Sequence, residues 1–141
     1  ACAAKNLQEI LSLDIMHWSL TDDAMENWFK HYDIKAVIAE ADSMCPNVVK
    51  SFDYKRESGD LWDFVYIDGG HDREVVEADI ENWQDRCKFI GFHDFADRGH
   101  KNKHRVVFRG LVKAVQAAQE KYGWEQVGER ANSEIIFKTC L

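Results

Sequence analysis

Apolar and amphipathic segments alternate along the chain in a pattern that predicts strands and helices in turn. Short apolar runs predict strands at residues 7–15, 34–39, 62–67 and 88–92. The run at 62–67 (WDFVYI) is the clearest, because a nearly continuous apolar stretch is typical of a buried parallel strand. Segments with one apolar stripe predict helices at 21–32, around 48–52, after Asp72, and from about 106 to 122, where Gly123 provides a stop. Two further strands, at 124–127 and 134–138, are separated by a polar turn.

This order predicts an α/β fold. Strands that alternate with helices form a mostly parallel sheet with helices on both faces, and the last two strands are expected as an antiparallel pair. The chain has 141 residues, a single proline at Pro46, and neither a repeat nor a Pro- or Gly-rich linker. We therefore interpret residues 1–141 as a single domain.

Composition narrows the function classes. A formal net charge of -7 argues against a nucleic-acid backbone or an anionic membrane as the main partner. No apolar run approaches the ~18 residues of a membrane span, and no signal peptide is visible. The four cysteines are scattered without a C-x-x-C pair, which favours small core residues in a reducing cytoplasm over a zinc or redox motif.

Acidic residues mark the ends of the predicted strands. Asp14, Asp68 and Asp94 end three of them, and Asp42 stands just beyond a fourth. In parallel α/β sheets, ligands bind beyond the carboxyl ends of the strands, so four carboxylates along one edge indicate a functional site. The alternative is that each acid only caps a helix or occupies a solvated turn.

Several side chains have simple structural interpretations. Ser43 is a candidate cap for a short helix that has Pro46 in its first turn, and Asp72 is a candidate cap for the helix after it. Asp79, on that second helix, is expected to be an ordinary surface acid. The polar, basic segment from Arg98 to Arg105 is expected to be a solvated loop, with covering of a substrate as the alternative.

Two motifs resemble a known family. The stretch WDFVYIDGGHDREVVEADIENW, followed by KFIGFHDF, resembles the Rossmann-like, S-adenosylmethionine-dependent O-methyltransferases that act on small molecules. The nearest groups in appearance are the catechol O-methyltransferase type and the metal-assisted sugar and natural-product methyltransferases. The resemblance implies transfer of a methyl group from S-adenosylmethionine to a hydroxyl of a small-molecule acceptor, with or without a divalent metal.

The resemblance also implies a cofactor site. Asp14 would accept hydrogen bonds from the two ribose hydroxyls, since each carboxylate oxygen can accept one. Asp42 and Ser43 stand where the family contacts the adenine, and Asp68 would border the same cofactor.

The resemblance also implies roles for a second set of residues, near the acceptor hydroxyl. Asp68 would be a metal ligand together with His93 and Asp94, and Mg²⁺ or another divalent metal would then acidify the substrate hydroxyl. His93 stands where the family has an acid, which weakens a hard-oxygen site. His71 is the candidate general base, with Asp68 beside it, because its ordinary pKa lies near neutrality. A hydrogen bond from His71 to a backbone carbonyl is the alternative.

The chain departs from the family at its start. Relatives open with a strand and a glycine-rich turn that binds the methionine end of the cofactor, and only Ala1–Asn6 precede the first predicted strand here. The absent strand would lie in the middle of the sheet, between the strands that end at Asp14 and Asp68. We expect an N-terminally truncated domain, with the gap filled by an upstream segment or by another chain. Losing two or three charged contacts of about 1.5–3 kcal/mol each predicts cofactor binding roughly a thousandfold weaker than normal.

Three functions stay open. The first is a methyltransferase acting on a small-molecule acceptor, and the second is a non-catalytic Rossmann-like binding or assembly module that has lost the cofactor loop. The third is a metal-dependent hydrolase using Asp68, His71, His93 and Asp94. In each case we expect a cytoplasmic protein with neither nucleic acid nor membrane as its partner, and a homo-oligomer is one open possibility.

Overall fold

The computed structural model describes residues 9–14, 27, 30–31, 33–52, 59–95, 108–130 and 134–141. Internal contacts divide the chain into two compact units, Ala1–Ser43 and Met44–Leu141. The predicted helix at 21–32, apart from three positions, and the basic segment Arg98–Arg105 lie outside the described residues.

The first unit contains a two-stranded parallel sheet. Strand β1 (Glu9–Asp14) pairs with β2 (Lys35–Glu40), and the register places Asp14 opposite Glu40. The strands predicted at 7–15 and 34–39 are therefore confirmed. Because the pairing is parallel, the carboxyl end of β1 lies at the same sheet edge as the segment that leads from β2 to Asp42.

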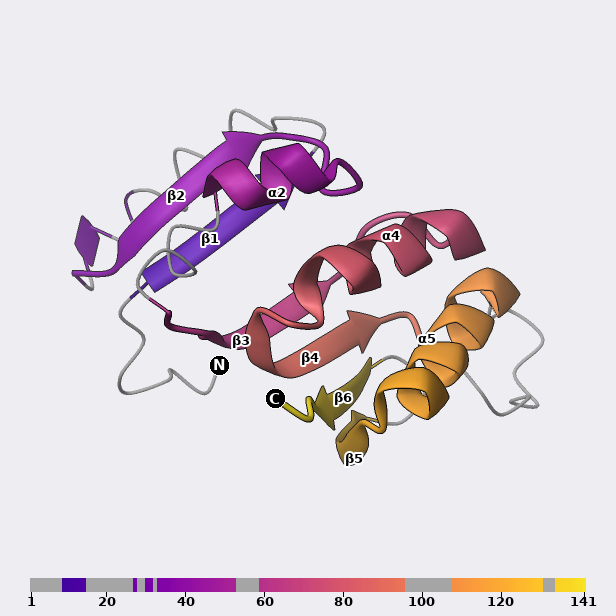
Figure 1. The fold of residues 1–141 in the computed structure, drawn as a ribbon. Coiled ribbons are helices and arrows are strands. Elements are labelled where there is room, and N and C mark those ends of the chain that lie inside the picture. Colours follow the sequence, from indigo (N-terminus) through magenta and orange to yellow (C-terminus); the bar gives the residue numbers. More distant parts are fainter. Residues whose placement is uncertain are drawn as a thin grey trace. The chain divides into compact units, whose positions relative to one another are not determined.

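The second unit contains a four-stranded sheet. Its strands are β3 (Trp62–Ile67), β4 (Cys87–His93), β5 (Glu125–Arg130) and β6 (Glu134–Lys138), in the order β3-β4-β6-β5. Strands β3 and β4 are parallel, whereas β6 runs antiparallel to both of its neighbours, as predicted for the closing pair. Figure 1 shows β3 at one edge of this sheet.

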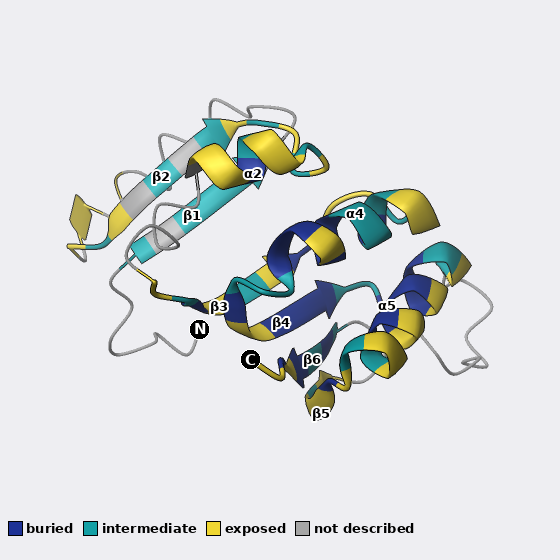
Figure 2. Cartoon of the chain, in the orientation of Figure 1, coloured by how far each residue is buried: buried dark blue, intermediate teal, exposed yellow. Residues whose placement is uncertain are grey.

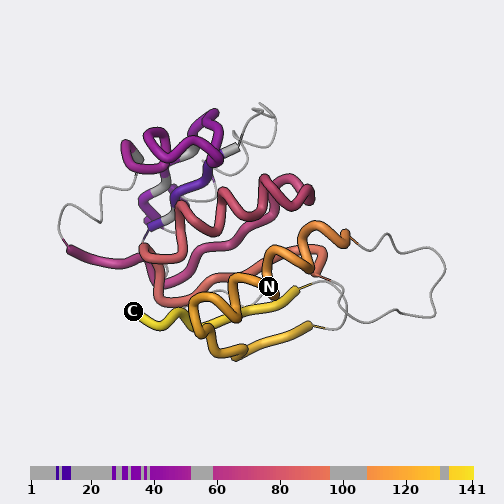
Figure 3. The backbone as a smooth tube through the Cα atoms, turned by 45° about the vertical axis from the view of Figure 1, so that its right-hand side comes forward, coloured from indigo at the N-terminus to yellow at the C-terminus, as the bar shows by residue number. Residues whose placement is uncertain are grey.

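Two helices pack side by side on one face of the four-stranded sheet (Figures 1 and 3). Helix α4 (Arg73–Trp83) connects β3 to β4, and α5 (Arg109–Tyr122) precedes β5. Helix α5 ends at Gly123, whose φ of 68° is the left-handed conformation that glycine adopts without steric cost. The predicted stop at Gly123 is confirmed.

The core lies between these helices and the sheet (Figure 2). Alternate residues of β4 and β6 point toward the helices, so Ile90, Phe92, Ile135 and Phe137 are all buried. Burying each such side chain contributes about 1.5–3 kcal/mol relative to exposure. The opposite face of β3 and β4 carries the exposed aromatic residues Phe64, Tyr66 and Phe89.

Strands β1 and β2 form one sheet and β3, β4, β6 and β5 another, and the described residues contain no strand that pairs with both β1 and β3. The absent strand that the resemblance implies between those ending at Asp14 and Asp68 stays a prediction.

The short helix begins differently from the prediction. Helix α2 (Pro46–Phe52) starts at Pro46, and the amides of Val48 and Val49 donate to the carbonyl of Cys45. Cys45 is therefore the residue before the helix, and Ser43 lies in the preceding turn rather than at the N-cap. The proline fits at the first helical position because it needs no hydrogen-bond acceptor there.

None of the described helices is long and apolar enough to cross a membrane.

Candidate functional site

The ends of β3 and β4 position three of the predicted site residues. Asp68 follows β3 directly, His93 is the last residue of β4, and Asp94 comes next. In the parallel register Ile67 lies opposite Phe92, so the two strands end side by side. Adjacent strands lie about 4.8 Å apart, which brings the side chains at these ends within reach of one another.

Asp94 adopts a left-handed backbone with a φ of 54°. This conformation costs most residues about 1–2 kcal/mol, and aspartate and asparagine tolerate it best because their side chains hydrogen-bond locally. Strain of this kind concentrates at functional sites. Here it turns the Asp94 carboxylate back toward the histidines.

His71 completes the site from the turn before α4. Asp72 is the N-cap residue of that helix, as predicted, although its carboxylate makes no capping hydrogen bond. His71 is the residue immediately before this N-cap, so it lies at the end of the turn that leads into α4.

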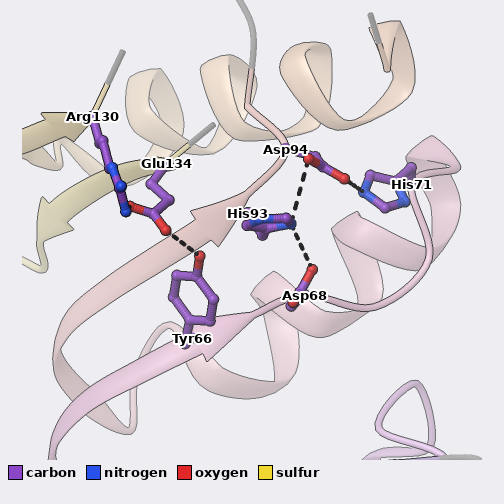
Figure 4. A network of polar contacts seen from close by, with 7 residues as sticks. All are labelled: Tyr66, Asp68, His71, His93, Asp94, Arg130 and Glu134. Carbon is purple, nitrogen blue, oxygen red and sulfur yellow. Dashed lines mark hydrogen bonds and ion pairs between the residues drawn. The ribbon is translucent and has the colours of Figure 1, made fainter. Parts of the chain in front are cut away.

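The four side chains form a continuous chain of contacts that we call the Asp–His cluster: Asp68, His93, Asp94 and His71 (Figure 4). His93 Nδ1 lies 2.9 Å from Asp68 Oδ1 and 3.4 Å from Asp94 Oδ1. The other oxygen of Asp94, Oδ2, lies 3.2 Å from His71 Nε2. The prediction that the groups at these strand ends come together is confirmed.

A carboxylate oxygen faces one ring nitrogen of each histidine: Asp68 and Asp94 face His93 Nδ1, and Asp94 also faces His71 Nε2. A carboxylate accepts hydrogen bonds and cannot donate them, so these two nitrogens are the ones suited to donate.

Asp68, His93 and Asp94 are also the residues predicted to ligate a divalent metal, and His93 Nδ1 lies near one oxygen of each carboxylate. Within the described ranges, no group of three or more His, Cys, Asp or Glu side chains has the arrangement of a metal site. The predicted metal site of Asp68, His93 and Asp94 is therefore not supported.

Tyr66 borders the cluster on the exposed sheet face. Its ring centroid lies 6.3 Å from that of His93, and its hydroxyl donates to Glu134 Oε1 at 3.4 Å (Figure 4). Partial burial, reinforced by the negative charges of Glu134 and Asp68, raises the pKa of Tyr66 to about 12. Tyr66 is thus a neutral phenol near neutral pH.

One further neighbour of the cluster was not predicted. The Phe108 ring stacks on the His71 ring with centroids 3.9 Å apart.

Asp79 on α4 is buried rather than exposed. It is 3% exposed, so its prediction as a surface acid is wrong. The signal was in the sequence, because Asp79 is three residues after Val76 and four before Trp83, which places it on the buried stripe of α4.

The other predicted cofactor residues lie in or just after the first unit's sheet. Asp14 ends β1, and its side chain lies outside the described residues. Asp42 is exposed and Ser43 is partly buried, both just beyond β2. Their assignment to the ribose and adenine stays a prediction.

One comparison shows the fold. The chain resembles the crystal structure of a proposed caffeoyl-CoA O-methyltransferase from Staphylococcus aureus, with a TM-score of 0.59, 8% sequence identity, and coverage of 96% of this chain and 77% of that one. No family model and no curated protein sequence matches the chain. The likeness shows the Rossmann-like methyltransferase fold, which confirms the predicted fold class.

Proposed function

We propose that this protein is an S-adenosylmethionine-dependent methyltransferase that acts on a hydroxyl group of a small molecule. The observation that carries the proposal is the Asp–His cluster at the carboxyl ends of β3 and β4. Ligands of parallel α/β sheets bind at such strand ends. The fold shared with an O-methyltransferase structure supports the same reaction class.

His71 is the proposed general base. Methyl transfer to a hydroxyl requires that the acceptor oxygen loses its proton as the oxygen–methyl bond forms. His71 Nδ1 takes that proton, while Asp94 holds Nε2–H at 3.2 Å and stabilises the imidazolium that results. Methyl transfer also depends on placing the acceptor oxygen in line with the methyl group.

The remaining cluster residues support this step. Asp68 and Asp94 together orient His93 through its Nδ1–H. The Asp68 carboxylate is about half exposed, so it is also available to a ligand at the end of β3. We assign the cofactor's ribose to Asp14 and its adenine to Asp42 and Ser43. S-adenosylmethionine supplies the methyl group on a sulfonium, and the proposed chemistry contains no metal-dependent step.

Methyl transfer is tested with labelled S-adenosylmethionine and a panel of hydroxyl-bearing small molecules. The result expected is a labelled product whose rate of formation falls by about 10²–10⁴ in His71→Ala, the usual contribution of a positioned base. His31→Ala is a matched control, because His31 is an exposed histidine of the other unit. Cofactor binding without transfer to any acceptor would instead favour the binding-module alternative, and equal rates for both histidine variants would exclude His71 as the base.

A further inference from the structure

The start of α5 packs directly against the turn that carries His71. Gly110 is the second residue of α5, and a Cβ atom there would lie 2.8 Å from both His71 O and Arg73 N. Real Cβ atoms essentially never approach backbone that closely. Only glycine therefore allows the helix to lie flush against this turn.

The residue before α5 contacts the His71 side chain itself. Phe108 precedes the helix, and its ring stacks on the imidazole with an interplanar angle of 27°. Stacking fixes the plane of the imidazole, whereas the 3.2 Å contact with Asp94 fixes its rotation within that plane. Together the two contacts leave His71 one orientation.

We propose that Phe108 and Gly110 are positioning residues for His71. Gly110 sets the backbone of the turn and Phe108 sets the ring, so that Nε2 faces Asp94 and Nδ1 faces the proton it accepts. This role rests on the proposed function of His71 as a base. The proposal gives a role in catalysis to the start of α5, which the sequence predicted only as the beginning of a helix.

Nuclear magnetic resonance tests the positioning independently of catalysis. A phenyl ring stacked at 3.9 Å shifts the ring protons of its neighbour upfield. In Phe108→Leu the His71 ring protons should move downfield, while those of His93, which lacks this stack in the described residues, should stay in place. Phe108→Tyr retains an aromatic ring and should retain the upfield shift.

Gly110→Ala tests the backbone contact, and Gly128→Ala is its matched control. A Cβ at Gly128 would meet Ile136 Cβ at 3.5 Å, an ordinary contact, so this substitution should leave the His71 signals unchanged. Gly110→Ala should move them. In the methyl-transfer assay, Phe108→Leu and Gly110→Ala should lower kcat by at least about tenfold, because misplaced catalytic groups lose rate steeply. The KM for S-adenosylmethionine should stay within about twofold of the wild-type value. Phe108→Tyr should keep the wild-type kcat.

The two proposals fail separately. His71 signals that do not move in Phe108→Leu would overturn the positioning role, whatever the activity. Signals that move as expected in a protein that transfers no methyl group would leave the positioning in place and contradict the proposed function. A kcat that falls as far in Phe108→Tyr as in Phe108→Leu would also count against a role for the aromatic ring.

Discussion

Substitutions of Asp94 separate its backbone role from its carboxylate role. The residue combines a φ of 54° with contacts to two histidines. Asp94→Gly removes the carboxylate and suits the left-handed backbone, whereas Asp94→Ala removes the carboxylate and keeps a Cβ. Asp94→Asn keeps the side-chain shape and tolerance of this backbone but loses the charge.

The expected stabilities follow from these differences. Alanine in the left-handed region costs roughly 1–2 kcal/mol, and it gains roughly 0.4–1 kcal/mol over glycine from a less flexible unfolded chain. Asp94→Ala should therefore be roughly 0.8 kcal/mol less stable than Asp94→Gly, within a range of about 0–1.6 kcal/mol. Each lost histidine contact adds at most about 1 kcal/mol, since the Asp94 side chain is 39% exposed and solvent screens the interaction.

Urea unfolding of the wild type and the three variants measures these differences. The order expected among the variants is Asn, then Gly, then Ala, with unchanged m-values. All three should lose methyl transfer, with Asp94→Gly inactive although it folds. An Asp94→Ala variant more stable than Asp94→Gly would refute the left-handed backbone, and an active Asp94→Gly would refute the role of the carboxylate.

Three further predictions concern neighbouring groups. Burial raises the pKa of the Cys87 thiol to about 12, so mass spectrometry after alkylation should show Cys140 modified before Cys87, which stays protected until the protein unfolds. The pKa of Tyr66 is raised from 10.0 to about 12, so the native phenol keeps its proton after the unfolded one has lost it. Stability should therefore fall as pH rises through that interval, and less so in Tyr66→Phe; an equal pH dependence would contradict the shift. Asp79→Ala should lower the free energy of unfolding by about 1–3 kcal/mol, since it removes a buried carboxylate together with the interaction that this carboxylate makes. Glu77→Ala, at an exposed ion pair on the same helix, should cost under about 0.5 kcal/mol, and similar losses would refute the difference in burial.

Hydrophobic pattern was sufficient to predict the elements around the site. The strand at residues 62–67 has the predicted bounds, and the polar turn Asp68-Gly69-Gly70 marks its end in the sequence. Asp72 stands at the N-cap of α4, and Gly123 ends α5 in the left-handed conformation. Both positions could be predicted because these residue types favour helix ends. The strand-end rule then placed Asp68, His93 and Asp94 together.

Contacts across the fold were less predictable. The stacking of Phe108 on His71 joins residues 37 positions apart, and it depends on how α5 packs against α4. The contact of Tyr66 with Glu134 likewise depends on the sheet order β3-β4-β6-β5. Neither contact is indicated by a local pattern in the sequence. The sequence also could not distinguish contacts between His93 and two carboxylates from coordination of a metal ion by the same three residues, because both arrangements use the same residue types.

Calorimetric titration with S-adenosylmethionine tests the central claim most directly. We expect binding that Asp14→Ala weakens by about tenfold or more, because a charged hydrogen bond contributes about 1.5–3 kcal/mol. Glu125→Ala, which removes an exposed acid on β5, should bind as the wild type does. Binding that Asp14→Ala leaves unchanged, or no binding at millimolar cofactor, would contradict the claim.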